Sequence, residues 1–265
     1  MNPSPTPATE PGLATRLAQV FFAPGRLFAG LAGQPVRHTL WVAPVVTYVL
    51  ACWLVAGLLF STDWAQPELL AVQRAAMQKQ FQPQLDRGVM TQADVDQFIG
   101  QMERFAVVGQ LAQGVLTPLF VAGLSPFWGG LVLWAGAAWI LRRPLPYLKG
   151  VEAAGLSLMV LALGVLVKGG MCLALRTQFT GPGVILLLPQ FDPANQLHNT
   201  LLMVDVFALW MVAVRAVALA RLTGGRGWVA GLWVGGVWAV FTGGLLLLGW
   251  AAQLLSAWMQ QLGQR

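Results

Sequence analysis

The chain has 265 residues, of which 57% are hydrophobic and only 10% are charged, and its formal net charge is +6. Soluble domains carry about 25% charged residues, so this composition excludes an ordinary soluble protein. The lysine and arginine residues are spread along the chain and no segment is densely basic, which argues against a nucleic-acid partner. We therefore expect an all-α membrane protein.

The amino-terminal region has two parts. Residues 1–12 are rich in proline and lack an apolar run, so we predict a disordered tail and no signal peptide. Residues 13–38 combine apolar residues at helical spacing with Arg16, Arg26 and Arg37, and Pro24 divides them into two short interfacial helices. Their basic residues suit the anionic cytoplasmic membrane surface, and packing against the end of the bundle is an equal alternative.

Five stretches are long and apolar enough to cross a bilayer as helices, for which about 20 residues are needed. Three of them contain no charged residue, whereas the third and fourth carry isolated charges. The fourth and fifth are joined by so few residues that they must form an antiparallel hairpin. We predict a five-transmembrane-helix bundle in a membrane domain of residues 39–256, with spans at about 39–60, 107–141, 151–175, 200–220 and 227–255, followed by a tail at 257–265.

Two hydrophilic segments interrupt these spans. Residues 61–104 are predicted to form a helical outer loop, with helices at about 65–82 and 92–104, because Thr91 can cap the second helix and Asp94 lies in its first turn. This second helix is expected to run into the second span, where two prolines predict a kink or a tilt. Between 176 and 200, a run of six apolar residues is too short to cross the membrane, and we expect it to cover the bundle.

The orientation follows from the arginine and lysine residues of the short loops, which favour the cytoplasmic side. A cytoplasmic amino terminus places most of these residues inside, and we therefore predict that orientation. The basic residues that this orientation places on the cytoplasmic side are Arg16, Arg26, Arg37, Arg142, Arg143, Lys149, Arg221 and Arg226.

Four ionisable residues within or beside the predicted spans are the candidate polar site: Glu152, Lys168, Asp205 and Arg215. Charges inside a membrane are unfavourable unless they have partners or water. Lys168 and Asp205 are expected toward the outer end and Glu152 and Arg215 toward the inner end, so each pair could form across a helix interface. The alternative is a polar pathway for an ion or a proton, which usually needs more titratable groups than these spans offer, and we favour structural pairing.

The fifth span carries small residues at every fourth position: Gly227, Gly231, Gly235, Ala239 and Gly243. Such a face lets another helix approach closely. We expect it to pack within the bundle, with a homo-oligomer interface as the alternative.

No catalytic, cofactor-binding or metal-binding motif stands out. Cys52 and Cys172 lie inside predicted spans and suggest buried thiols, with neither a disulfide framework nor a metal site. The scattered tryptophans are interpreted as bilayer and packing residues rather than a ligand cage. We predict that the protein is not an enzyme and needs no cofactor.

Three segments together resemble the bacterial branch of the Yip1 domain family. They are Phe21-Phe-Ala-Pro24-Gly-Arg-Leu-Phe28-Ala-Gly-Leu31 with Pro35 and Pro44, Thr91-Gln-Ala-Asp94, and Leu202-Met-Val-Asp205-Val-Phe207-Ala-Leu-Trp210. The resemblance covers about residues 16–250. It implies a five-span helical protein with a cytoplasmic amino terminus and no established catalytic activity. We expect it in the bacterial cytoplasmic (inner) membrane, where the loop charges and five spans place the carboxyl terminus in the periplasm. The aspartate-leucine-tyrosine-glycine-proline motif of eukaryotic relatives is missing from the tail, which argues against a small-GTPase partner.

Two functions follow as hypotheses. The first is a non-enzymatic multi-pass membrane protein that organises partner proteins or lipids in the membrane, with membrane lipids, other membrane proteins or a second copy as partners. The alternative is a small transporter or channel that uses Lys168, Asp205 and Arg215. A continuous polar cavity reaching Lys168 and Asp205 would favour the transporter.

Overall fold

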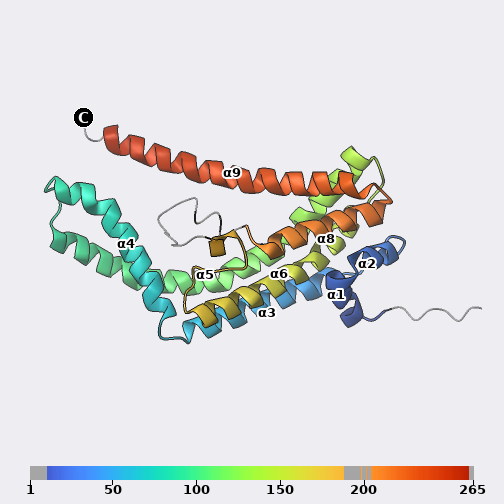
Figure 1. Cartoon of the computed structure of the whole chain (residues 1–265), viewed down its shortest axis with the longest axis horizontal. Helices are drawn as coiled ribbons and strands as arrows, with labels where there is room; N and C mark the ends of the chain where they lie inside the picture. The colour runs from blue at the N-terminus through green and yellow to red at the C-terminus, as the bar shows by residue number, and fades with distance from the viewer. Residues whose placement is uncertain (1–10, 188–197, 199–200, 202–203, 263–265) are drawn as a thin grey trace, which may run out of the picture.

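The computed structural model describes residues 11–187, 198, 201 and 204–262. These residues form an elongated bundle of helices (Figure 1). Five of the described helical segments are long and apolar enough to span a membrane, which confirms the predicted all-α multi-pass architecture. They are Thr39–Phe60, Gly109–Leu141, Tyr147–Leu175, Val206–Thr223 and Gly227–Ala251.

The two amino-terminal helices form as predicted. Helix α1 is Leu13–Phe22 and helix α2 is Pro24–Leu31, with Pro24 at the first helical position, where its missing N–H has no consequence. Val20 and Phe28 are fully buried, because α1 packs on the third span and α2 on the fourth. The two helices therefore pack against the end of the bundle, which was one of the two alternatives. Residues 1–10 of the predicted amino-terminal tail lie outside the described part of the chain.

The predicted boundaries hold for the first span and shift for others. Helix α3 is Thr39–Phe60, as expected. Helix α5, Gln92–Ala135, runs from the outer loop into the second span without interruption and continues as a π-helical segment, η1, Gly136–Leu141. The fourth span, α8, begins only at Val206, because Asp205 caps it. The fifth, α9, is Gly227–Leu262, so most of the predicted tail is helical.

Helix α6, Tyr147–Leu175, lies at the centre of the bundle, between α3 and α8 in Figure 1, and also packs on α5. Glycines make these contacts close. A Cβ atom added to Gly130 of α5 would lie 2.8 Å from the backbone nitrogen of Val151, and one added to Gly164 would lie 2.8 Å from Phe207 Cβ of α8. Added to Gly155, it would clash with Trp41 of α3. The helix axes can approach this closely only without side chains at these positions.

The glycine face of α9 does not take part in this packing. A Cβ atom added to Gly227, Gly231, Gly235 or Gly243 would have no atom of the described chain within 4 Å. The helix contacts the bundle through a different face, on which Ala230 and Val234 are its only buried residues in the described part of the chain. The expectation that the glycine face packs within the bundle is therefore wrong. Residue spacing defines a face but cannot say which face is covered.

The outer loop is helical, as predicted. Helix α4, Ala65–Asp86, packs beside the first half of α5 and projects from the bundle at the left of Figure 1. The guanidinium of Arg74 donates to both carboxylate oxygens of Glu103, at 2.9 and 3.0 Å. The rings of Phe81 and Phe98 meet edge to face, with centroids 5.3 Å apart. The segment after α6 forms a short 3-10 helix, η2, Val184–Leu187, and buries Ile185.

The α5–α6 contact predicts that Gly130→Ala will destabilise the protein. The added methyl group would press on the backbone of Val151, and overpacking of this kind costs about 1–3 kcal/mol. Gly123→Ala is the matched control, since Gly123 lies on the same helix and faces open space. Unfolding of both variants in detergent with added dodecyl sulfate measures the difference. Equal stabilities would contradict the close contact.

The cap of α5 predicts a pH dependence. The Asp94 carboxylate accepts from the Thr91 hydroxyl at 2.7 Å and from the Thr91 backbone N–H at 2.9 Å, and these bonds lower the pKa of Asp94. Because the pKa is lower in the folded state, the cap is complete above the ordinary value of about 3.9 and is lost as the pH falls through the folded value. Amide exchange in the first turn, corrected for intrinsic rates, should accelerate over this acidic range. In Asp94→Asn the same turn should show no such transition.

Candidate functional site

The four predicted polar residues do not form the expected pairs. The Lys149 ammonium lies 2.6 Å from Glu152 Oε2, one turn away on the same helix, and both side chains are buried. This contact is an ion pair without hydrogen-bond geometry, and neither carboxylate oxygen of Glu152 has a hydrogen-bond partner among the described residues. The expected pairing of Glu152 with Arg215 is therefore wrong, because a lysine three residues before Glu152 neutralises it.

Asp205 and Lys168 also have separate roles. Asp205 Oδ1 accepts from the backbone N–H of Ala208 at 2.6 Å, so the carboxylate caps α8 at its start. Its backbone forms a β-bridge with Gly183. Lys168 is half-buried on α6, and its stem lies beside Gly181. No ion pair joins Lys168 to Asp205 within the described chain, so this expected pair is wrong as well.

Arg215 lies halfway along α8 and is held by hydroxyl groups. Its Nε donates to Ser157 Oγ of α6 at 2.9 Å, and its Nη2 donates to Ser125 Oγ of α5 at 3.1 Å. Gly129 leaves room for the group, since a Cβ atom there would lie 3.0 Å from Arg215 Cζ. Arg215 lines a cavity of about 270 Å³ between α5, α8 and α9, whose lining includes neither Lys168 nor Asp205. The three residues expected to line one pathway are thus in separate surroundings.

Of the basic residues expected at the membrane surface, Arg26 and Arg37 are exposed at the end of the bundle. Arg16 is buried, and its Nε donates to the backbone oxygen of Pro11 at 3.0 Å. The expectation of a surface position is therefore wrong for Arg16, because Arg16 lies on the side of α1 that faces the rest of the protein.

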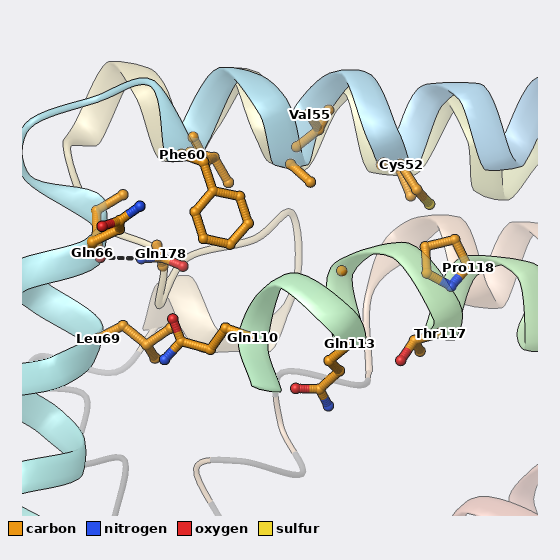
Figure 2. A pocket seen from close by; sticks show the side chains of 15 residues that line it. Cys52, Val55, Phe60, Gln66, Leu69, Gln110, Gln113, Thr117, Pro118 and Gln178 are labelled. Carbon is orange, nitrogen blue, oxygen red and sulfur yellow. Dashed lines mark hydrogen bonds between the residues drawn. The ribbon is translucent and has the colours of Figure 1, made fainter. Parts of the chain in front are cut away.

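A larger cavity, of about 420 Å³, lies between the end of α3, the start of α4 and the part of α5 where the second span begins. Figure 2 shows α3, α4 and α5 around it, with the ring of Phe60 between α3 and α5. Its volume is within the range of small-molecule and lipid sites. Most of the lining is apolar, and none of the described residues that line it is charged. The polar side chains in it are those of Gln66, Gln110, Gln113, Thr117 and Gln178, together with the Cys52 thiol.

Gln110 is the residue of this lining whose side chain has a buried polar atom without a partner among the described residues. Its Nε2 is buried and donates to no atom of the described chain. Leaving a buried donor unpaired costs about 1–3 kcal/mol, so an acceptor oxygen of a bound molecule would be favourable there. The amide of Gln178, on the α4 side of the cavity in Figure 2, is already engaged and donates to the backbone oxygen of Ala65.

Glu68 of α4 holds the segment that places Gln178 in the cavity wall. Its carboxylate accepts from the Thr177 hydroxyl at 2.6 Å and from the backbone N–H of Gln178 at 2.8 Å. These bonds tie the segment after α6 to the helix that follows α3. They hold Gln178 in the cavity wall at the end where the transmembrane helices meet the outer loop.

Sequence reasoning missed this cavity. Its polar residues are glutamines and a threonine, which have no motif and are distributed over α4, α5 and the segment after α6. One available signal was the spacing of Gln110, Gln113 and Thr117, which places three uncharged polar side chains on one side of a helix at the start of an apolar span. The structure also places Trp128 and Trp238 in the lining beside Arg215, whereas the tryptophans were expected to face the bilayer or to pack.

The contacts of Glu68 predict that Glu68→Ala will loosen the segment 176–180. Both hydrogen bonds to the carboxylate would be lost, and bonds to a charged group contribute roughly 1.5–3 kcal/mol each when partly buried. Hydrogen exchange at Gln178 should accelerate. Glu103→Ala is the control, since its ion pair with the exposed Arg74 is expected to contribute less than about 1 kcal/mol. Unchanged exchange in Glu68→Ala would contradict the role of Glu68.

In the described part of the chain, no group of three or more histidine, cysteine, aspartate or glutamate residues is placed to hold a metal ion. No protein-family model, no characterised protein and no solved structure gave a match to the chain.

Proposed function

We propose that this protein is a non-enzymatic, multi-pass membrane protein of the Yip1 type that organises lipids in the bacterial cytoplasmic membrane. Its site is the 420 Å³ cavity between α3, α4 and α5, and its ligand there is an uncharged ester-linked lipid segment. The observation that carries the proposal is an apolar, uncharged cavity with one buried, unpaired amide donor, Gln110 Nε2.

The position of the cavity supports a lipid ligand. Its lining includes the last turns of the first span, up to Phe60, and the first turns of the second span, from Gln110 to Pro118. This is the level at which the hydrocarbon of a bilayer gives way to the polar interface, and lipid ester groups lie there. The apolar wall suits an acyl chain, and the Gln110 amide suits an ester carbonyl, which accepts hydrogen bonds without carrying charge.

The proposed orientation places this cavity at the periplasmic side. Support comes from the opposite end of the bundle, where α1, α2 and the α8–α9 turn lie together in Figure 1. Arg26, Arg37, Arg221 and Arg226 belong to that end and are exposed, as the preference of basic residues for the cytoplasmic side requires. The carboxyl terminus of α9 is then periplasmic.

Photocrosslinking tests the cavity. The probe is phosphatidylethanolamine with a diazirine on its acyl chain, and adducts are expected on residues 52–60 and 110–118. Gly114→Leu should reduce them several-fold, because the new side chain fills the cavity beside Phe60, with its Cβ at an ordinary 3.8 Å from the ring. Gly123→Leu, on the same helix but facing open space, is the control and should leave them unchanged.

A second pair of variants tests the hydrogen bond. Gln110→Leu should lower crosslinking by about three- to tenfold, since a neutral hydrogen bond contributes about 0.5–1.5 kcal/mol, and should not lower the stability of the lipid-free protein. Gln101→Leu replaces an exposed glutamine of the same helix as the control. Adducts that are the same in Gly114→Leu, Gln110→Leu and the controls would refute a lipid in this cavity.

A further inference from the structure

The second cavity, lined by Arg215, has a different chemistry from the first. It has a volume of about 270 Å³ and lies between α5, α8 and α9. Its walls are apolar and aromatic, with Trp128 from α5, Met211 from α8 and Trp238, Phe241 and Leu245 from α9. Arg215 is the one charged residue among the described residues of the lining.

The charge of Arg215 is far from either end of its helix. It lies nine positions after Val206 and eight before Thr223, or about 12–14 Å of helix in each direction. An arginine near the end of a span can extend its head group to the interface, but this guanidinium is held in place by Ser125 and Ser157. It therefore stays at the depth of the hydrocarbon core, where a charge without a counter-charge is strongly unfavourable.

The local partners of Arg215 leave its charge uncompensated. Both serines are neutral, and no carboxylate of the described chain lies within ion-pair distance. Glu152, the predicted partner of Arg215, is paired with Lys149. Nη1 donates to no atom of the described residues, so the guanidinium keeps free donors while it lines the cavity. A planar guanidinium with free donors matches the geometry of an oxyanion such as a carboxylate or a phosphate.

We propose that this cavity binds an anionic amphiphile, with its oxyanion head on Arg215 and its apolar tail between α5 and α9. A tail is required because the cation lies at mid-membrane behind apolar walls, which a hydrated inorganic anion does not enter without loss of its water. The cavity itself offers apolar room for the tail, since Trp238, Phe241 and Leu245 of α9 line it. The shared head chemistry is a carboxylate, as in a fatty acid, or a phosphate monoester, as in a lysophosphatidate.

The test measures tryptophan quenching in the purified full-length protein in neutral detergent, at an alkaline pH that ionises the fatty acid. A dibrominated stearate quenches tryptophans that it contacts, and Trp128 and Trp238 line the cavity. Quenching should saturate with the acid and be much weaker with its methyl ester. Oleate and oleoyl lysophosphatidate should compete, and their relative strengths distinguish a carboxylate from a phosphate site, whereas inorganic phosphate should not compete.

Arg215→Met should weaken binding of the brominated acid by at least about tenfold, because a charge-assisted contact contributes roughly 1.5 kcal/mol or more. Arg215→Lys, which keeps the charge but not the planar fork, should bind with intermediate affinity. Arg226→Gln removes an exposed arginine outside the lining and should bind as the natural chain does. Gly114→Leu fills the other cavity and should also have no effect, so this result is independent of the proposed function.

Equal binding of the acid and its methyl ester would overturn the proposal, as would undiminished binding in a folded Arg215→Met variant. Competition by inorganic phosphate at the level of oleate would overturn the requirement for a tail. If Arg215→Met does not fold, the comparison of acid with methyl ester on the unmodified chain decides the question by itself.

Discussion

The close approach of α6 to its neighbours determines the rest of this structure. In a bilayer the hydrocarbon solvates apolar side chains as well as another helix does, so helices associate through tight van der Waals contact and hydrogen bonds. Glycines at the α5–α6, α3–α6 and α6–α8 contacts permit that approach, as at Gly130, Gly155 and Gly164. Helix α9 makes no comparable contact through its own glycine face, and it lies at the edge of the bundle.

The setting of Arg215 depends on the same contact. Gly130 faces Val151, and the adjacent Gly129 faces both Ala154 and the guanidinium. Ser125 lies one turn from Gly129, and Ser157 lies one turn from Ala154, so the close α5–α6 approach brings both hydroxyls within reach of one arginine on α8. The serines thus follow from the packing, and the arginine joins three helices at a depth where water is scarce.

Sequence reasoning located what depends on composition and local patterns. The charge-free stretches identified the spans, and the Thr91–Asp94 capping box located the start of α5. It failed for features whose position depends on tertiary contacts. Asp205 belongs to an apolar stretch, yet its carboxylate caps a helix, which moves the start of the span. Glu152 pairs with Lys149 on its own helix, and this ion pair depends on which side of α6 is buried. The cavity beside Gln110 is lined by residues of α3, α4, α5 and α6 and by Gln178 after α6, and no local pattern contains that information.

The two cavities differ in a way that follows from their depth. At the level where the second span begins, polar lipid groups are available, and an unpaired amide can be satisfied by a neutral acceptor. At mid-span such groups are absent, and the partners of the Arg215 guanidinium in the described chain are two neutral hydroxyls. For this reason we propose that a counter-charge reaches it on an apolar carrier. Helix α5 contributes to both cavities, Gln110 to the first and Trp128 to the second. Its uninterrupted length therefore places an uncharged cavity and a cavity with one arginine at different positions along one helix.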